Sequence, residues 1–288
     1  MSDKNPEYDF KWCPGCGDFS VRRALENAIE RRRIETELPV ENNVIVAGIG
    51  CSGNLVHLLE GNQPYGFHGI HGRSLPIAMG VKMGSPELNV LVVAGDGDFL
   101  GIGLEHIAPQ AARNLDITVI IMDNAVYGLT KGQSSPTTLP GEITPSTPFG
   151  KLEEAMDPLM LYLTMGVSFV ASAISTKVKD MSQMMSDAMD HPGFSIVHVQ
   201  SPCTTYNDTY EQLKGNVKKG IEPIAWAIDA DHDPSDIESA RNVVESDGIP
   251  VGVIYRNQER ETFHKRIEEI GLRTNPKTTE TLLKRYAI

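Results

Sequence analysis

The sequence is poor in basic residues, with 26 Lys and Arg against 38 Asp and Glu over 288 residues and a formal net charge of −12. A protein that binds nucleic acid needs a basic surface to neutralise the phosphates. The imbalance therefore argues against nucleic acid as a partner. A small anionic ligand stays compatible with it, because a pocket needs only a few local charges.

Long apolar runs are also missing. No stretch approaches the roughly 18 uninterrupted apolar residues that a membrane-spanning helix needs. The N-terminus, Met1 to Glu7, is polar and lacks the apolar segment of a secretory signal. Together these absences predict a cytoplasmic protein that has no membrane partner.

Cysteine is scarce, with only four residues at positions 13, 16, 51 and 203. In a reducing compartment, cysteines more often bind metals or carry out redox chemistry than form structural disulfides. Hydrophobic residues make up 40% of the chain and charged ones 22%, which is typical of a globular protein with a sizeable core.

Apolar runs rich in β-branched residues predict buried strands, and the stretches between them are compatible with helices. This alternation predicts an α/β fold with a mostly parallel sheet flanked by helices. The pattern changes after about Thr204, which predicts a domain over residues 1–204 and a C-terminal extension over 205–288 that packs on the domain or on a partner. The predicted strands are 43–49, 90–94, 117–122 and 194–199, and the predicted helices are 19–34, 74–83, 100–114 and 176–189.

Each predicted strand is followed by a residue with useful chemistry. Cys51, Asp96, Asn124 and Cys203 come just after the first, second, third and fourth of these strands. Open α/β sheets bind ligands at the carboxyl ends of their parallel strands. We therefore expect the four side chains to gather at one edge of the sheet.

The segment from Gly95 to Asn124 predicts a site for a divalent metal and a diphosphate. Glycines at 95 and 97 let the backbone approach phosphate oxygens, and Asp96 offers a carboxylate to Mg²⁺. Asn124 follows the next strand and can complete the metal's oxygen ligands. The alternative is a tight turn in which Asp98 caps a helix and Asn124 is an ordinary turn residue.

A second glycine-rich segment, Gly48 to Gly53, fits the G-x-G-x-x-G pattern of nicotinamide-dinucleotide sites. The segment after it is short and turns at Gly61 to Pro64. The position for an acidic ribose ligand, about 20 residues on, holds His68 to Arg73 instead. The dinucleotide interpretation is therefore the weaker one.

The C-x-x-C pair at Cys13 and Cys16 fits a redox-active dithiol, half of a zinc site or half of an iron–sulfur site. A dithiol leaves Cys51 and Cys203 unexplained. Four thiolates suit zinc or a [4Fe–4S] cluster, and sequence alone does not separate the two by geometry. The wide, irregular spacing lacks the second C-x-x-C of a zinc ribbon and favours the cluster.

The chain resembles known families at two levels. The Gly-Asp-Gly opening and the closing Asn124 resemble the cofactor motif of thiamine-diphosphate enzymes. Over Trp12 to Asn207, the whole set of motifs resembles the β subunit of 2-oxoacid:ferredoxin oxidoreductases. These motifs are WCPGCG at Trp12, GIGCSGN at Gly48, HGIHGR at His68, GDGD at Gly95, DNAVYGLTKGQSSPT at Asp123 and SPCTTYN at Ser201.

The resemblance implies roles for particular residues. Asp96, Asn124 and the carbonyl of Val126 would bind Mg²⁺, and His71 and Lys131 would be catalytic. Cys13, Cys16, Cys51 and Cys203 would hold one [4Fe–4S] cluster beside thiamine diphosphate. The cofactor-binding residues would be Cys51, Ser52, Gly53, Asn54, His71, Gly72, Gly95, Asp96, Gly97, Asp98, Asn124, Tyr127, Gly128, Leu129 and Thr130.

The resemblance also implies an activity and partners. Thiamine diphosphate accepts the electrons that a 2-oxoacid releases on losing CO₂. In this family coenzyme A takes the acyl group, ferredoxin takes the electrons, and a separate α subunit holds the pyrimidine end of the cofactor. Lys131 would suit 2-oxoglutarate over pyruvate, or it is a surface lysine. A turn histidine is the alternative for His71, and a non-redox decarboxylase subunit or a zinc module is the alternative for the chain.

Overall fold

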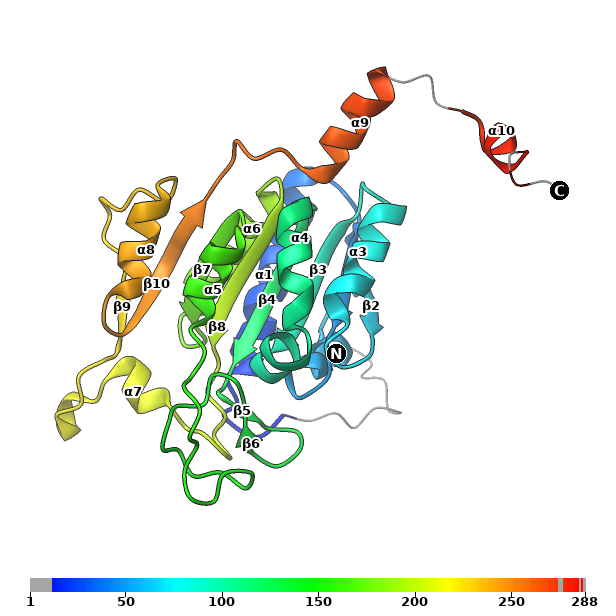
Figure 1. Cartoon of the computed structure of the whole chain (residues 1–288). Coiled ribbons are helices and arrows are strands. Elements are labelled where there is room, and N and C mark those ends of the chain that lie inside the picture. The colour runs from blue at the N-terminus through cyan, green and yellow to red at the C-terminus, as the bar shows by residue number, and fades with distance from the viewer. Residues whose placement is uncertain (1–11, 274–276, 285, 287–288) are drawn as a thin grey trace.

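The computed structural model describes residues 12–273, 277–284 and 286. Its centre is an eight-stranded sheet in the order β2-β1-β3-β4-β8-β7-β10-β9 (Figure 1). The first six strands in this order pair in parallel, and β10 pairs with β7 in the antiparallel direction. The strands are β1 (Asn43–Ala47), β2 (Tyr65–His68), β3 (Asn89–Gly95), β4 (Ile117–Asp123), β7 (Phe169–Ile174), β8 (Phe194–Gln200), β9 (Ala225–Ala227) and β10 (Ile249–Arg256).

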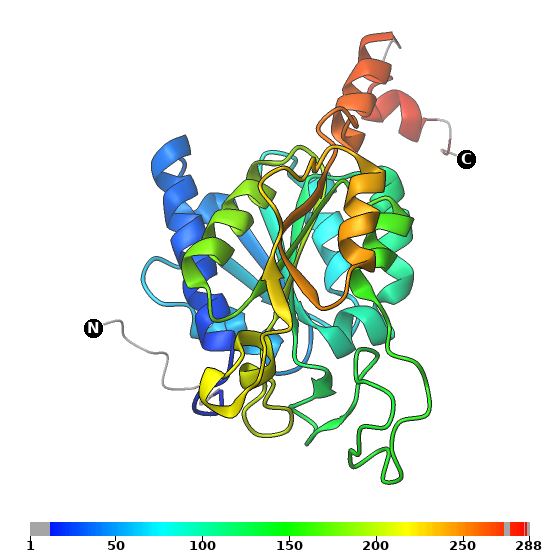
Figure 2. The same ribbon diagram turned by 90° about the vertical axis from the view of Figure 1, so that its left-hand side faces the viewer.

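Helices cover both faces of the sheet (Figure 2). On one face, α1 (Asp18–Thr36) packs beside α6 (Val178–Asp190). The opposite face carries α3 (Ser74–Gly84), α4 (Ile107–Arg113), α5 (Pro158–Met165) and α8 (Ile237–Glu245). Each helical layer encloses its own apolar core against the sheet. This double cover explains why β3, β4, β7 and β8 are buried almost throughout.

The expected α/β architecture is confirmed, and all four predicted strands form within one or two residues of their predicted ends. One predicted helix differs. The segment 100–114 begins inside a π-helical turn, Gly97–Ile102, continues through a 3₁₀ turn, Leu104–His106, and only then forms the α-helix α4. Because the π-helical turn begins at Gly97, Asp98 lies inside this turn and does not cap a helix.

Part of the segment expected to extend from the domain is built into the sheet. β10 adds to β7, and β9 pairs in parallel with β10 at the outer edge. The remaining helices of this segment are α7 (Tyr210–Lys214), α9 (Phe263–Arg273) and α10 (Thr279–Leu283). None of the helices in the described ranges is long and apolar enough to cross a membrane.

The carboxyl ends of the parallel strands meet at the lower edge of the sheet in Figure 1. A small hairpin, β5 (Val126–Tyr127) and β6 (Gln133–Ser134), lies below this edge, and a long irregular loop joins it to α5. The short helix α2 (Leu55–Leu58) follows β1 at the same edge. Further 3₁₀ turns occur at Val40–Asn42, Ser52–Asn54 and Val217–Lys219.

Candidate functional site

A pocket of about 510 Å³, including its opening to solvent, lies at the carboxyl ends of β1, β3 and β4. It is formed by the loop after β1, the glycine-rich turn after β3 and the start of the β5–β6 hairpin. The lining residues are Ile49, Gly50, Cys51, Ser52, His71, Gly95, Asp96, Gly97, Asp98, Asn124, Val126, Tyr127, Gly128, Leu129 and Thr130. Segments that are distant in the sequence therefore meet at the predicted edge.

Two buried carboxylates share one hydroxyl group beneath the pocket. Thr137 Oγ1 lies 3.0 Å from Asp96 Oδ2 and 2.8 Å from Asp123 Oδ1. Asp123 also pairs through Oδ2 with His198 Nε2 at 3.0 Å. Because a hydroxyl has one proton to donate, Thr137 cannot satisfy both carboxylates at once.

The pKa values of the two carboxyl groups, Asp96 and Asp123, are shifted in opposite directions. Burial, followed by the charge of Asp123, raises the pKa of Asp96 to about 8. Burial acts in the same direction on Asp123, but hydrogen bonding and charge from His198 outweigh it and lower the pKa of Asp123. Asp96 is therefore the carboxylate that a cation would stabilise most, which fits a ligand of Mg²⁺.

Asn124 follows Asp123 at the end of β4, and its side chain folds back on the chain. Asn124 Oδ1 accepts a hydrogen bond from Val126 N at 3.1 Å. Ala125 between them has φ of 56°, a left-handed conformation. The turn role considered for Asn124 is thus present, and the same turn places Asn124 and Val126 in the pocket wall with Asp96.

Asp98 ties three pocket segments together. Its Oδ1 accepts hydrogen bonds from Ile49 N at 2.9 Å and Gly72 N at 2.8 Å, and lies 2.5 Å from His71 Nδ1. His71 is therefore held by a carboxylate, and the turn interpretation in which it only contacts backbone is wrong. About a third of its side chain is exposed, so the ring is available from the pocket.

Glycine is required at two positions near Asp98, because other segments pack closely against the backbone there. A Cβ on Gly72, which has φ of 69°, would lie 2.7 Å from the backbone carbon of Ile102. A Cβ on Gly97 would lie 2.3 Å from the Tyr127 ring, whose hydroxyl donates to Gly97 O at 3.1 Å. The space above Gly97 thus admits an aromatic ring, in addition to any close contact with phosphate.

Three predicted cofactor residues lie behind the pocket wall. Gly53 and Asn54 are buried in the 3₁₀ turn after Cys51, and Gly72 packs under Ile102. Neither these three nor Lys131 lines the pocket. Lys131 is exposed, has φ of 88° and follows Thr130, which does line it.

The four cysteines approach one another beside the pocket. Hydrogen bonds join their segments: Trp12 Nε1 donates to Cys51 O at 2.8 Å, and Gly17 N donates to Pro202 O at 3.1 Å. A Cβ built on Gly128 would lie 3.4 Å from Cys51 Sγ and 4.0 Å from Cys203 Sγ. All four cysteines are free thiols, and Cys51 belongs to both the cysteine group and the pocket.

Two of these thiols are strongly favoured in the neutral form. Burial, with the negative charge of Asp18 next, raises the pKa of Cys51 to about 12 and that of Cys16 further. Within the described residues, no three His, Cys, Asp or Glu side chains converge closely enough to hold one ion. In a [4Fe–4S] cluster each thiolate binds a different iron, so its ligands need not converge on a point.

Comparison with known proteins decides the family. Residues 48–199 match the family model of the C-terminal thiamine pyrophosphate-binding domain of thiamine pyrophosphate enzymes, and residues 203–271 match that of the C-terminal part of the pyruvate ferredoxin oxidoreductase β subunit. The chain is 40% identical over 265 residues to subunit beta of 2-oxoacid:ferredoxin oxidoreductase 1 from Aeropyrum pernix, covering 90% of this chain and 81% of that protein. The chain belongs to the β subunits of the 2-oxoacid:ferredoxin oxidoreductases.

Two further relatives carry more specific names. The chain is 37% identical over 221 residues to the 2-oxoglutarate oxidoreductase subunit KorB of Mycobacterium tuberculosis, covering 76% of this chain and 57% of that one. It is also similar to a solved 2-oxoglutarate:ferredoxin oxidoreductase from Magnetococcus marinus, with a TM-score of 0.83 and 31% identity, covering 98% and 94% of the two chains. The resemblance inferred from the six motifs is confirmed.

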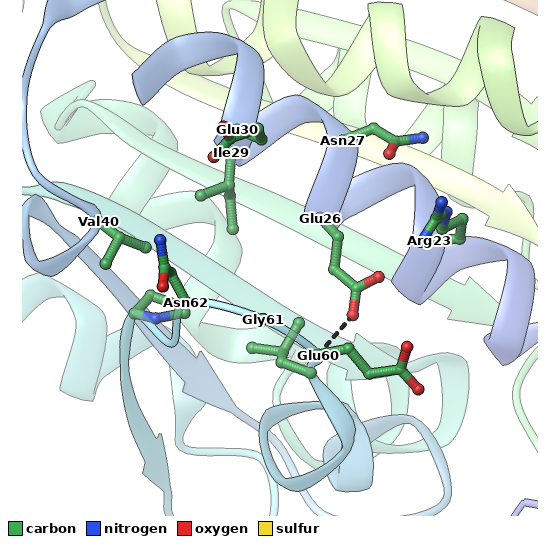
Figure 3. Close-up of a pocket in the computed structure, with 11 residues that line it drawn as sticks. Arg23, Glu26, Asn27, Ile29, Glu30, Val40, Glu60, Gly61 and Asn62 are labelled. Carbon is green, nitrogen blue, oxygen red and sulfur yellow. Dashed lines mark hydrogen bonds between the residues drawn. The ribbon is translucent and has the colours of Figure 1, made fainter. Parts of the chain in front are cut away.

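The β subunit has a second cavity, beside α1 (Figure 3). It lies between α1 and the loop that leads to β2 and carries three glutamates, Glu26, Glu30 and Glu60. Glu26 Oε1 accepts a hydrogen bond from Glu60 N at 2.8 Å, which Figure 3 shows as a dashed line. No residue predicted to bind the cofactor or a metal lines this cavity.

Sequence reasoning missed several residues of the β subunit that the site uses. Thr137 lies within the quoted DNAVYGLTKGQSSPT motif, but only the fold brings it to Asp96. His198 sits in the middle of an apolar strand, and its pairing with Asp123 depends on the neighbouring register of β4 and β8. Ile49 and Gly50 line the pocket and lie within the glycine-rich pattern that was considered for a dinucleotide.

Proposed function

We propose that this β subunit binds thiamine diphosphate through Mg²⁺ and serves the CoA-dependent oxidative decarboxylation of 2-oxoglutarate, or the reverse carboxylation. The observation that supports it most is the shared position of Cys51, which lines the pocket and belongs to the cysteine group. An electron acceptor on the four cysteines would lie next to the cofactor. Electrons would leave the site without an aldehyde being released.

In this proposal the pocket residues hold the cofactor. Asp96, Asn124 and the carbonyl of Val126 bind Mg²⁺, which offsets the negative charge of the diphosphate. Asp98 fixes His71 and the loop at Ile49 around it. Thiamine diphosphate supplies the electron sink for decarboxylation when it is bound.

The cysteine group supports a [4Fe–4S] cluster as the acceptor. Cys16 and Cys203 are buried, Cys51 faces the pocket, and Cys13 is exposed. Iron would supply the positive charge that stabilises the thiolate form of the four ligands. The exposed side at Cys13 suits the transfer of electrons to an external carrier, which we propose is ferredoxin.

An α subunit is proposed as the partner that completes the site. Activation of thiamine normally uses a glutamate beside the pyrimidine ring, and no glutamate is among the described residues that line the pocket. Such a group, together with the pyrimidine end of the cofactor, would come from the α subunit. The name of the relative from Aeropyrum pernix, a subunit beta, is in line with a heteromeric enzyme.

The choice of 2-oxoglutarate rests on two relatives and on Lys131. The relative from Mycobacterium tuberculosis is named for 2-oxoglutarate, and the Magnetococcus marinus enzyme was solved with 2-oxoglutarate, coenzyme A and succinyl-CoA. Lys131 is exposed and follows Thr130, which lines the pocket, and it would offer a positive charge to a second carboxylate. A pyruvate or broad 2-oxoacid specificity is the second candidate, since the Aeropyrum pernix relative is named only for 2-oxoacids.

The test is anaerobic co-purification with the candidate α subunit, followed by iron, sulfide and thiamine analysis. Dye reduction is then measured with CoA and either 2-oxoglutarate or pyruvate. We expect about four irons and four sulfides per β subunit, the content of one [4Fe–4S] cluster, and faster reduction with 2-oxoglutarate. Loaded protein that reduces no dye with any 2-oxoacid contradicts the function, whereas thiamine without iron identifies a non-redox decarboxylase.

A further inference from the structure

A buried lysine belongs to the long loop that follows the β5–β6 hairpin, and none of the roles described so far uses it. Lys151 is 7% exposed. Its Nζ donates to three backbone carbonyls, Thr138 O at 2.7 Å, Ser135 O at 3.2 Å and Pro136 O at 3.3 Å. An ammonium has three N–H donors and no acceptor, so the carbonyls match its donors in number. The ammonium therefore fastens one short segment, residues 135–138.

The surroundings of Lys151 are unusual for a buried charge. Such a charge is usually paired with one of opposite sign, because taking it out of water costs several kcal/mol. Within the described residues, Lys151 has no carboxylate partner. A neutral side chain would close the loop without this cost. A charge at this position therefore indicates that holding residues 135–138 in one place has a use beyond closure of the loop.

The segment held by Lys151 contacts both turns that carry the proposed Mg²⁺ ligands. Thr137 Oγ1 lies 3.0 Å from Asp96 Oδ2, in the turn after β3. Thr138 Oγ1 donates to Ala125 O at 2.5 Å, in the turn after β4. This second turn carries the other two proposed ligands, one on each side of Ala125. Two neighbouring hydroxyl groups thus connect the lysine to the whole set of proposed ligands.

The backbone of Lys151 is itself fixed. Lys151 N donates to Glu142 O at 3.0 Å, and Gly141 N donates to Lys151 O at 2.8 Å. The preceding residue, Gly150, has φ of 94°, and a Cβ there would lie 3.0 Å from Gly141 O. These contacts close the neck of the loop. The side chain therefore starts from a rigid position, which a residue that supports a binding site needs.

We propose that Lys151 is a positioning residue that holds Thr137 and Thr138 against the two turns of the Mg²⁺ site and thereby strengthens the binding of Mg²⁺ and the diphosphate. The inference rests on the proposed function, since it requires that Mg²⁺ and thiamine diphosphate bind in this pocket. Without the ammonium, the three carbonyls lose the donor that they share. The two hydroxyl groups are then no longer held where they orient the ligands.

The test measures the affinity of the complex with the α subunit for Mg²⁺ in the presence of thiamine diphosphate, by isothermal titration calorimetry. Lys151→Met keeps the length and the apolar stem of the side chain and removes the ammonium. We expect the affinity to fall about 10-fold, the lower end of the effect of residues that support metal ligands. Wild-type affinity in folded Lys151→Met protein would overturn the proposal.

Lys82 provides the matched control. It is also buried, and its Nζ donates to Leu88 O at 2.7 Å and lies 3.1 Å from Asp116 Oδ2, at the amino end of the sheet. Lys82→Met should lower the free energy of unfolding and leave the affinity for Mg²⁺ unchanged. An equal loss of affinity in both variants would reflect the loss of any buried lysine and would contradict the proposal.

A double substitution distinguishes positioning from a merely structural role. Thr137→Val removes the hydroxyl through which Lys151 is proposed to act on Asp96. Substitutions that act through one shared contact are not additive. Lys151→Met should therefore weaken Mg²⁺ binding less in Thr137→Val protein than in the wild type. The same fold-loss in both backgrounds would show that Lys151 does not act through Thr137, and the proposal would fail.

Lys151→Gln covers the case in which Lys151→Met does not fold. It keeps two N–H donors, and it should weaken Mg²⁺ binding in the same direction. If neither variant folds, Lys151 serves stability alone and the proposal is wrong. A wild-type complex that binds no Mg²⁺ and no thiamine diphosphate would instead contradict the proposed function, so the two failures are distinguishable by titration of the wild type.

Discussion

Asn114 and Asn124 stand just outside opposite ends of β4, and both are buried. Asn114 closes α4 in a left-handed conformation, with φ of 54°. Its Oδ1 accepts from Ser168 Oγ at 2.7 Å and from Phe194 N at 3.0 Å, and its Nδ2 donates to Arg260 O at 3.0 Å. Among the described residues, Asn124 Oδ1 instead accepts a single hydrogen bond, from Val126 N.

The two asparagines illustrate how the two ends of the sheet differ. At the amino end, Asn114 is fully occupied in joining α4, β8 and the segment before α9. At the carboxyl end, Asn124 adjoins a pair of carboxylates that share one hydroxyl, and Asp98 has a buried oxygen without a partner among the described residues. Polar groups that the fold leaves incompletely satisfied are where a ligand can contribute binding energy.

The largest effect on stability should come from Asn114→Ala. It leaves several buried groups without partners and puts alanine into a left-handed conformation, so the free energy of unfolding should fall by about 3 kcal/mol or more. Denaturant unfolding of the purified chain measures this. Asn124→Ala should cost less than half as much, and equal losses would break the contrast between the two ends.

Ligand binding should show the opposite order. Asn124→Ala removes a proposed Mg²⁺ ligand, and we expect the affinity of the complex with the α subunit for Mg²⁺ and thiamine diphosphate to fall at least about 10-fold, or about 1.4 kcal/mol. Isothermal titration calorimetry measures it. Asn114→Ala protein that remains folded should bind normally, so weakened binding there would contradict the division of roles.

Thr137→Val tests whether the shared hydroxyl supports the metal site. The isosteric change leaves Asp96 and Asp123 facing each other without a donor between them, and loss of such a supporting bond weakens metal binding by roughly 10-fold. Mg²⁺ titration in the presence of thiamine diphosphate gives the affinity. Thr118→Val is the matched control, because Thr118 is a buried threonine in β4 whose hydroxyl bonds to Ala188 O at 3.1 Å.

The smallest effect concerns acid sensitivity at the amino end. Burial, and after it the charge of Arg256, lowers the pKa of His191 to about 4 from its ordinary 6.5. The unfolded chain therefore takes up a proton first, and stability falls as the pH drops from about 6.5 towards 4. His191→Asn should lose on the order of 1 kcal/mol less than the wild type between pH 7 and pH 5, measured by denaturant unfolding; parallel losses would contradict this.

The sequence predicted the strands of this β subunit well where hydrophobicity is continuous. β3 and β4 are covered on both faces, so their residues are apolar without interruption and their ends are marked by Gly95 and Asp123. β7 and β10 were not predicted. β7 contains small residues, Ala171, Ser172 and Ala173, that give a weak strand signal. β10 contains Pro250 and Gly252, which also weaken the signal, and it is held in the sheet by pairing with β7 and β9.

The candidate site was predictable for residues that lie in short motifs at strand ends, such as Asp96, Asn124 and Cys51. These positions follow from the topology of a parallel sheet. Thr137 and His198 were not predictable, because each becomes relevant through a contact across many residues of chain. Thr137 reaches Asp96 from 41 residues away, and His198 meets Asp123 from 75 residues away.

The position of β10 bears on how the polypeptide is made. Until residues 249–256 have left the ribosome, β7 presents an open backbone edge, although its side chains are already those of an interior strand. The last cysteine, Cys203, emerges well before that. All four cysteines can thus be outside the ribosome while the sheet is incomplete. A protein shortened at residue 204 would keep the unpaired edge of β7, which is prone to aggregation.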